Sequence, residues 1–273
     1  MKIFNWNIVS FRSLIKKNNI IDNIKSNTVS HSNTFHNYII NNNYDILCLQ
    51  EIKLNEKDLH IMDEYFPEYP YKYVNIPHTK KGYSGVAILS KYEAISFDDH
   101  LLHNNGKESE GRYIQIEFDK FYLINIYFPN AGEGLKRLHY KNDFNKYLYN
   151  KLKKLKDKKE VIIVGDFNAI QYEFDTYNFE KHFNKLAGVT EDEMKFLNKL
   201  VDNGFYNSFR ELYGNKKQYS YFSYRWPGRI HNKGLLIDFV LATSNILKKI
   251  KKIKYLDNIY GSDHLPIKIE LNI

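Results

Sequence analysis

Short runs of strand-forming residues recur along the whole chain, and they constrain its fold more than any other feature. The run RYIQIEF at 112–118 alternates aliphatic with polar or aromatic side chains, a pattern typical of a strand with one exposed face. The run VIIV at 161–164 is apolar throughout and indicates a central strand covered on both faces. About eight such runs are present: MKIFNWNI, YDILCLQEI, SGVAILS, RYIQIEF, FYLINIYFP, EVIIVGDF, LLIDFVLA and LPIKIELNI.

Two helical patterns lie between these runs. Residues 135–156 are predicted to form a helix, because apolar side chains recur on one face and lysines fill the other. The segment EDEMKFLNKLVDNG is predicted to form a second helix, which begins with a capping box from Thr190 to Glu193 and stops at Gly204. This mixture of strands and helices favours layered α/β architecture. The apolar stripe of the first helix consists of Phe144, Tyr147, Leu148, Leu152 and Leu155.

The length and composition suit one domain. With 273 residues, of which 43% are hydrophobic, the chain can bury a sizeable core. We expect a single catalytic domain over 1–273, interrupted at about 18–43 by a polar, poorly ordered insertion rich in Asn and Ser. The one cysteine, Cys48, excludes an intramolecular disulfide framework and is expected to be a buried apolar residue.

The net charge of the chain is positive. Forty Lys and Arg residues against 32 Asp and Glu give a net charge of +8 and a pI of about 9.1, which favours a polyanionic partner. The N-terminus lacks an apolar signal-peptide core, and no 18 apolar residues run together. We therefore expect a soluble, intracellular protein without a membrane partner, and the nucleus, the cytoplasm and a viral factory stay open as its compartment.

Polar side chains stand at the ends of four separate strand-forming runs. A single acidic residue at such a place usually satisfies a turn or caps a helix. Four such places together indicate a site, because strands hold side chains rigidly at the open rim of an α/β fold. The residues are Glu51, Asp166, Asn168, Asp238, Asp263 and His264.

This set of side chains predicts metal-assisted phosphodiester hydrolysis. Oxygen ligands dominate and no cysteine joins them, which suits Mg²⁺ or Mn²⁺ better than zinc. Such an ion neutralises phosphate oxygens and the leaving group. Asp166 is suited to deprotonate or orient a water, and the Asn168 amide is suited to donate to that water or to a phosphate. Asp238 is suited to hold His264 in one tautomer and to favour the imidazolium beside a phosphate.

Eight segments, in order along nearly the whole chain, resemble the exonuclease III type of AP endonuclease. GDxN and SDH alone would indicate only the wider superfamily of endonucleases, exonucleases and phosphatases, whereas PNAG followed by RLxYK is specific to the DNA repair branch. The segments are WN at 6–7, LQEIK at 49–53, GYSGVAILSK at 82–91, EGR at 110–112, YFPNAGEGLKRLHYK at 127–141, GDFNAI at 165–170, IDFVLA at 237–242 and GSDHLPI at 261–267.

The resemblance implies a four-layer α/β sandwich in which two packed mixed β-sheets are flanked by helices. It also implies a monomeric, Mg²⁺-dependent endonuclease of base excision repair, for which Mn²⁺ can substitute. Such an enzyme hydrolyses the phosphodiester 5′ to an abasic site in double-stranded DNA and leaves a 3′-hydroxyl and a 5′-deoxyribose phosphate. Accompanying 3′–5′ exonuclease or 3′-phosphodiesterase activity is also implied.

Carried over position by position, the resemblance also implies roles for single residues. It leaves open whether Asp166 or His264 is the base and whether one metal or two act; we favour Asp166 as the base and His264 as a phosphate contact. The metal ligands are Asn7, Glu51 and Asp263, with Asp166 and Asn168 for a second metal or the water. The catalytic group comprises Tyr127, Asp166, Asn168, Asp238 and His264. The DNA contacts are Arg12, Lys53, Tyr83, Asn130 and Arg225, and the wall of the abasic pocket is Tyr221, Leu235 and Ile237.

The chain departs from the family pattern at several positions. Val9 stands where the family has Asp or Asn, which predicts weaker metal binding. Leu235 stands where an aromatic residue is common, and this affects selectivity against intact nucleotides. Of the side chains placed to wedge into DNA, Arg225 with Trp226 suits the role, whereas Glu133 would repel phosphate. The tract at 179–188 matches poorly, so no DNA contact is carried over to it.

Two alternative functions stay open. One is a phosphoesterase of the same superfamily that acts on a non-DNA ester, and the PNAG segment argues against it. The other is a DNA-binding homologue that has lost catalysis through Val9, which the intact acidic and histidine set argues against.

Overall fold

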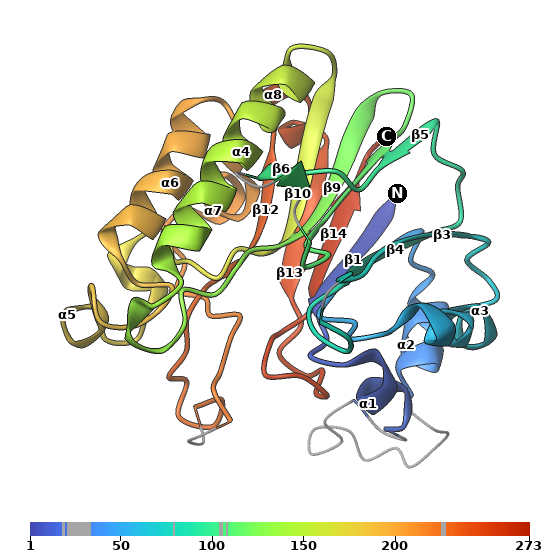
Figure 1. The fold of residues 1–273 in the computed structure, drawn as a ribbon, viewed down its shortest axis with the longest axis horizontal. Coiled ribbons are helices and arrows are strands. Elements are labelled where there is room, and N and C mark those ends of the chain that lie inside the picture. Colours follow the sequence, from blue (N-terminus) through green and yellow to red (C-terminus); the bar gives the residue numbers. More distant parts are fainter. Residues whose placement is uncertain (18–19, 21–33, 79, 104–105, 108, 225–227) are drawn as a thin grey trace.

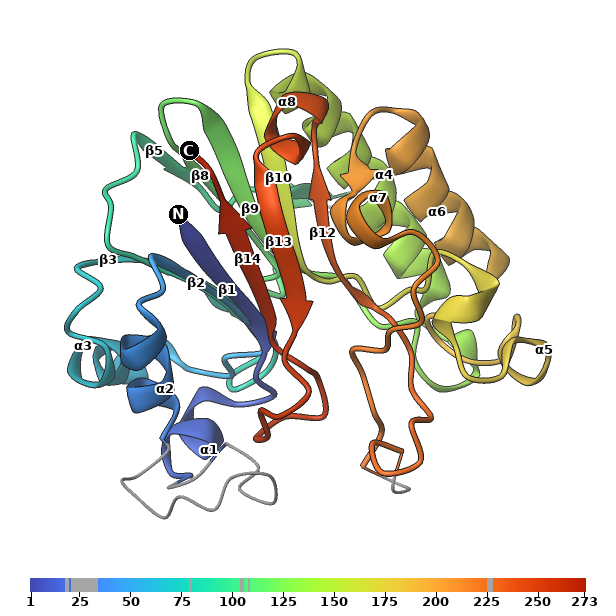
Figure 2. The ribbon, with the colours of Figure 1, turned by 180° about the vertical axis from the view of Figure 1, so that it is seen from behind.

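The strand-forming runs pair into two six-stranded sheets that pack face to face (Figure 1). The computed structural model describes the chain except residues 18–19, 21–33, 79, 104–105, 108 and 225–227. Helices α1, α2 and α3 cover the outer face of the first sheet, and α4, α6 and α7 cover that of the second (Figures 1 and 2). The predicted four-layer α/β sandwich with two mixed sheets is confirmed.

The first sheet has the strand order β13-β14-β1-β2-β4-β3. Strands β1 and β2 are parallel, whereas β14 and β4 run antiparallel to them on either side. In β1, Ile3 joins the core between the sheets, while Phe4 and Trp6 pack outward beneath α1 and α2. The strands are β1 (Lys2–Asn7), β2 (Ile46–Gln50), β3 (Tyr71–Asn75), β4 (Val86–Ser90), β13 (Ile250–Tyr255) and β14 (Ile267–Leu271).

The second sheet has the order β11-β12-β10-β9-β8-β5. Its central strands β9 and β10 are parallel and buried, as the apolar run at 161–164 predicts. Gly165 fits here because a Cβ would stand 1.9 Å from the Ile126 carbonyl oxygen. The strands are β5 (Ser96–Asp98), β8 (Tyr113–Glu117), β9 (Phe121–Tyr127), β10 (Glu160–Asp166), β11 (Tyr206–Asn207) and β12 (Asp238–Ala242); β6 (Leu102–His103) and β7 (Gly106–Lys107) pair separately.

The two predicted helices are present as α4 and α6. Helix α4 starts three residues later than expected, after a 3-10 turn that contains Gly134 at a positive φ of 64°. The capping box of α6 is confirmed, because Thr190 and Glu193 bond to each other's backbone N–H groups. The helices are α1 (Phe11–Ile15), α2 (Phe35–Asn42), α3 (His60–Tyr65), α4 (Leu138–Lys156), α5 (Phe179–His182), α6 (Glu191–Asp202), α7 (Ser208–Tyr213) and α8 (Ser244–Leu247), with 3-10 turns at Glu56–Asp58, Glu133–Leu135 and Glu173–Asp175. Within the described ranges, none of these helices has the length and apolar character needed to span a bilayer.

The expected poor order of the tract at 18–43 is wrong for its last part, and the expected half-exposure of the run RYIQIEF is wrong. The Asn-rich tract at 18–43 was expected to be poorly ordered, but from Thr34 onward it forms α2, which buries Phe35 and Ile39. The rest of the tract, except Ile20, lies outside the described residues. The run RYIQIEF is not half-exposed, because Tyr113 and Gln115 are buried and hydrogen-bonded to each other.

Candidate active site

The polar side chains at the strand ends meet at one edge of the sandwich. Strands β1 and β2 are parallel; Asn7 is the last residue of β1, and Glu51 directly follows the last residue of β2. In the second sheet Tyr127 ends β9 and Asp166 ends β10, and Asp238 opens the antiparallel β12 opposite Asp166. These ends form the lower edge of both sheets in Figure 1.

Asp166 accepts hydrogen bonds from two residues, Asn168 and Asn7. Its Oδ1 accepts the backbone N–H of Asn168 at 2.7 Å, and its Oδ2 accepts the Asn7 Nδ2 at 2.9 Å. The Asn168 Nδ2 donates to the Phe128 carbonyl at 2.9 Å, and the Asn130 Nδ2 donates to the Asn168 Oδ1 at 2.8 Å. This network fixes the carboxylate and the carboxamide in one orientation.

Glu51 stands beside Asn7 at the end of the first sheet. Its Oε1 accepts from the Asn7 Nδ2 at 2.9 Å, and its Oε2 pairs with the Lys53 Nζ at 2.8 Å. The Asn7 Oδ1 accepts the backbone N–H of Val9 at 3.0 Å. Val9 therefore contributes a backbone donor to the site, and no side-chain ligand.

Several residues of this edge have left-handed backbone conformations. The φ angles are 61° at Val9, 54° at Glu51, 51° at Lys53 and 49° at Asn168. Asn tolerates this region, whereas a β-branched residue such as Val is strained in it. Such strain persists where surrounding structure fixes the backbone, and it is common at functional sites.

Asp238 and His264 form a buried pair opposite Asp166. The His264 Nδ1 lies 2.9 Å from the Asp238 Oδ2, which also accepts the Ser220 hydroxyl at 2.6 Å. The His264 Nε2 then lies 3.8 Å from the Asp166 Oδ2. The Ser262 hydroxyl accepts the His264 backbone N–H at 3.1 Å and fixes the loop that carries it.

The two groups that face each other across this gap have raised pKa values. Burial raises the pKa of Asp166 to about 7, with the Asp238 charge adding and the His264 charge opposing. Burial lowers the pKa of His264, but Asp238 and Asp166 outweigh it and raise this pKa to about 10. The proton therefore resides on His264 at neutral pH, and Asp166 is poised between its two protonation states.

Tyr127 is held by a buried arginine. The Arg112 guanidinium lies 4.5 Å from the centre of the Tyr127 ring and donates to the Tyr127 carbonyl at 3.2 Å. The Tyr83 hydroxyl accepts from Arg112 and from Arg137 at 3.0 Å each. Burial and then the charge of Glu51 raise the pKa of Tyr127 well above its usual value, so its hydroxyl stays a hydrogen-bond donor.

A cleft of about 600 Å³ opens over these groups. The side chains predicted for the abasic pocket form one wall of it, and the ring of Tyr221 lies 5.0 Å from that of His264. Among the other predicted residues, Lys53, Asn130, Glu133 and Asp263 also line the cleft. The pocket wall consists of Tyr221, Leu235 and Ile237, which pack in one apolar cluster with Ile170 and Val189.

Two predicted DNA contacts lie outside the lining of the cleft, and a third cannot be placed because it is not among the described residues. Arg12 is ion-paired with Asp58 and is not part of the lining of the cleft. Tyr83 lies behind Tyr127 and bonds to the two arginines. Arg225, with its neighbour Trp226, lies outside the described residues.

The donor set fits a cation. The Asp166 and Asp238 carboxylates lie within 4.8 Å of each other, and the Asp238 Oδ1 is buried without a hydrogen-bond partner in the described part of the chain. Burial, together with the Glu51 charge, raises the pKa of Asp263. A positive ion would offset the mutual repulsion of these clustered carboxylates.

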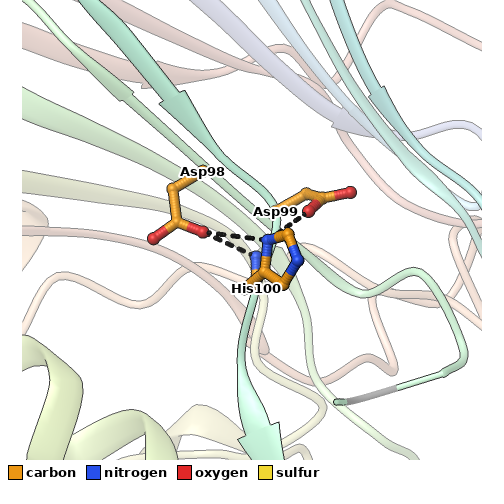
Figure 3. Close-up of side chains that lie close together, drawn as sticks. All are labelled: Asp98, Asp99 and His100. Atoms are coloured by element: carbon orange, nitrogen blue, oxygen red, sulfur yellow. Dashed lines mark hydrogen bonds and ion pairs between the residues drawn. The ribbon is translucent and has the colours of Figure 1, made fainter.

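A second acidic group lies far from the cleft. Asp98, Asp99 and His100 gather at the end of the edge strand β5 (Figure 3). The His100 Nδ1 lies 2.8 Å from Asp99, and the Lys151 Nζ lies 2.7 Å from Asp98. The Lys151 ammonium and the His100 ring already contact these carboxylates.

Comparison with known proteins identifies the family of this chain. The model of the endonuclease/exonuclease/phosphatase family matches residues 6–264. The chain belongs to this family. As the sequence motifs imply, this family member lies in the exonuclease III type AP endonuclease branch, which makes it a hydrolase of the nuclease class.

Relatives of this family member cover its full length. It is 35% identical over 281 residues to "DNA repair nuclease APEX1" of Danio rerio, spanning all of this chain and 83% of the relative. It is 30% identical over 277 residues to "Exodeoxyribonuclease" of Bacillus subtilis, with both chains fully covered. The fold is similar to that of AP endonuclease LMAP from Leishmania major, with a TM-score of 0.85 at 22% identity, over all of this chain and 87% of the other.

Four supporting residues of this family member were not predicted from its sequence. Arg112 and Lys141 lie within motifs that carry the resemblance. The sequence therefore singles out these two positions, but it does not predict which residues they contact. The Lys141 Nζ is buried and donates to the Asn168 carbonyl at 2.6 Å. Ser262 also belongs to a motif, whereas nothing in the local sequence marks Ser220 as the partner of Asp238.

Proposed function

We propose that this chain is a monomeric, Mg²⁺-dependent endonuclease that cleaves double-stranded DNA on the 5′ side of an abasic site. The product ends are a 3′-hydroxyl and a 5′-deoxyribose phosphate. The observation that carries the proposal is that the His264 Nε2 and the Asp166 Oδ2 lie 3.8 Å apart and that both residues line a cleft with an apolar wall. The names of the curated relatives support a DNA substrate.

The metal would be held at the edge of the first sheet. Asn7, Glu51 and Asp263 supply oxygen atoms there, and Asp166 with Asn168 would hold a second ion or the water. Oxygen donors without sulfur favour Mg²⁺, and Mn²⁺ substitutes with the same ligands. When bound, such an ion supplies positive charge for the phosphate oxygens and the leaving oxygen.

Asp166 serves as the base in this proposal. Its pKa of about 7 suits a group that takes a proton from water near neutral pH. The carboxamide of Asn168, held by Asn130 and the Phe128 carbonyl, keeps the water in line with the phosphorus.

His264 and Tyr127 act on the phosphate. The imidazolium, stabilised by Asp238, places a positive charge and an N–H donor opposite Asp166. The Tyr127 hydroxyl remains protonated and donates from the other side. Both groups stabilise the charge that develops on the phosphate in the transition state.

The apolar wall selects the abasic sugar. Tyr221, Leu235 and Ile237 offer no hydrogen-bonding side-chain group other than one hydroxyl, which suits a deoxyribose without a base. Lys53 and Asn130 line the same cleft and would contact the flanking phosphates, with Tyr83, Arg12 and Arg225 as further DNA contacts. A terminal 3′ nucleotide or 3′-phosphoester can reach the same atoms, which supports an accompanying 3′ exonuclease or 3′-phosphodiesterase activity.

A labelled duplex with one stable abasic analogue tests the function, with Mg²⁺ and with EDTA. We expect a nick immediately 5′ to the analogue in Mg²⁺ and none in EDTA. Asp166→Ala should lower the rate by about 10²–10⁴-fold while DNA binding persists, because a general base contributes on that order. The exposed Asp192→Ala is the matched control and should cut normally.

Absence of a Mg²⁺-dependent nick would refute the proposal. Retained binding without a nick would favour the non-catalytic homologue, and hydrolysis of small phosphoesters without DNA binding would favour the non-DNA phosphoesterase.

A further inference from the structure

A second groove, of about 940 Å³, lies between α7, the edge strand β13 and the loop that follows β13. Figure 2 shows β13 and α7 on the side of the molecule where the long loop below the sheets leads into β12. We propose that this groove, named here the basic groove, binds a single strand of nucleic acid. Its cationic lining consists of Lys216, Lys217, Arg229, Lys252 and Lys254.

The charge of the basic groove is strongly positive. Among its described lining residues, Asp257 is the one carboxylate against five cations. The four lysines are exposed, and within the described ranges they form no ion pair. Glu270, opposite Lys252 on the neighbouring strand, is paired with Lys268 instead. A row of uncompensated lysines suits a backbone of phosphates.

Aromatic rings lie among these cations. Tyr260 is 41% exposed, and the Arg229 guanidinium lies 3.8 Å from the centre of its ring. Tyr213 is 36% exposed beside Lys216, whose Nζ lies 5.7 Å from the ring centre. Exposed aromatic rings beside cations are the stacking platforms of proteins that bind single strands.

One buried polar atom in the groove lacks a partner. Tyr219 is 2% exposed and lines the groove, and its hydroxyl has no hydrogen-bond partner in the described part of the chain. The Lys217 Nζ lies 5.5 Å from the same ring. The ring of Tyr219 adds a further aromatic surface to the lining, while its hydroxyl lies below the surface of the groove.

The basic groove and the cleft lie on opposite sides of two hydrogen-bonded segments, 220–222 and 264–265. Tyr221 and His264 line the cleft, while their neighbours Phe222 and Leu265 line the groove. The Leu265 N–H donates to the Ser220 carbonyl at 2.6 Å, which joins the two segments. The groove is therefore separate from the cleft, and binding in it does not depend on catalysis.

The lysines of the basic groove could also have a role that does not involve nucleic acid. Those on β13 could serve only to keep an edge strand from pairing with another chain. An acidic protein segment could also match the charge. Neither role accounts for the exposed aromatic rings beside the cations, so the observations favour nucleic acid.

Fluorescence anisotropy with a labelled oligothymidylate in EDTA tests the proposal, because neither cleavage nor an abasic site is involved. The double variant Lys217→Ala with Lys254→Ala should bind about tenfold more weakly. Its log–log salt slope should be smaller by about 1.4, since each lost contact to a single strand removes about 0.7. Tyr260→Ala should weaken binding by about tenfold through lost stacking.

The control is Lys154→Ala with Lys158→Ala, which changes the net charge equally at exposed positions around the C-terminus of α4. We expect this control to bind nearly as the parent does. Equal losses in both double variants, unchanged binding in the groove variants, or displacement of the oligonucleotide by polyglutamate at equal charge concentration would each overturn the proposal. Thermal melting of every variant verifies folding, and failure here leaves the cleavage assay untouched.

Discussion

Val9 is unusual both in its backbone conformation and in its position in the cleft. It is β-branched and has a φ of 61°, a conformation that Asp or Asn adopts more readily. It also lines the cleft next to Asn7, whose Oδ1 accepts its N–H. The backbone there is fixed by the site, while the side chain supplies no ligand for a cation.

Val9→Asp should strengthen metal binding. The added carboxylate lies beside Asn7 and Glu51, and one more charged ligand is worth on the order of tenfold in affinity for a divalent ion. Titration calorimetry with Mn²⁺ measures this affinity without turnover. Val9→Asn is the control, because it relieves the backbone strain without adding charge and should change affinity less. Unchanged or weaker Mn²⁺ binding in Val9→Asp would show that this position faces away from the metal.

Glu110 compensates the buried arginine behind the active site. It pairs with the Arg112 Nε at 2.7 Å and with the Arg137 guanidinium at 2.7 Å. Burial alone would raise the pKa of Glu110, but the Arg112 and Arg137 charges outweigh it and hold this pKa below 4.5. Arg112 is fully buried, so removal of the carboxylate leaves a buried charge less compensated.

Glu110→Gln should lower the free energy of unfolding by roughly 3 kcal/mol at pH 7. A carboxyl whose pKa is lower in the folded state stabilises the protein above its unfolded pKa, and this stabilisation is lost as pH falls through the folded pKa. The difference between parent and variant should therefore stay constant from pH 7 to about 5 and shrink below pH 4.5. Urea unfolding across this range measures it, with the exposed Glu180→Gln as control. A difference independent of pH would contradict the stabilising role of the ion pair.

At the scale of elements, the regular patterns of the sequence predict α4, α6 and the central strands, because period and capping are local properties. The contacts between elements are not local. From the sequence, Lys141 is expected to be a solvated lysine of a lysine-rich helix. In the structure it is buried, and its Nζ pairs with Glu193 of α6 at 2.7 Å. The same Glu193 closes the capping box of its own helix, so one carboxylate joins both elements.

Lys141→Met should lower the free energy of unfolding by about 3–5 kcal/mol, since it leaves Glu193 buried without its partner. The matched control is Lys146→Met on the same helix, where the side chain is exposed and the change should stay within about 0.5 kcal/mol. Urea unfolding at neutral pH measures both variants. Equal effects in the two variants would contradict a structural role for the buried pair.

At the scale of the whole molecule, the site exists because two sheets end at the same edge. A buried amide network joins them beneath the site: the Gln50 Nε2 donates to the Asn5 Oδ1 at 2.7 Å and to the Asn125 Oδ1 at 2.6 Å. The Asn125 Nδ2 in turn donates to carbonyls of β2 and β4. We propose that the chain therefore acts as one catalytic domain, with Glu51 from one sheet and Asp166 from the other.

The acidic and histidine residues of this edge could be identified from the sequence because each follows or opens an apolar run in a recognisable motif. Their partners could not, since Ser220 meets Asp238 only through the packing of a distant loop. The ion pair between Arg12 and Asp58 likewise depends on how α1 packs near the turn at Glu56–Asp58. No local sequence pattern predicts this packing.

The most direct test of the central claim compares two duplexes of identical sequence, one with a stable abasic analogue and one with an intact nucleotide at that position. Under single-turnover conditions with Mg²⁺, the apolar pocket predicts incision directly 5′ to the analogue at least about 10²-fold faster than at the intact site. The new end should be a 3′-hydroxyl that a DNA polymerase extends. Equal incision of the two duplexes, or an end that the polymerase cannot extend, would contradict the proposal that this chain cleaves DNA on the 5′ side of an abasic site.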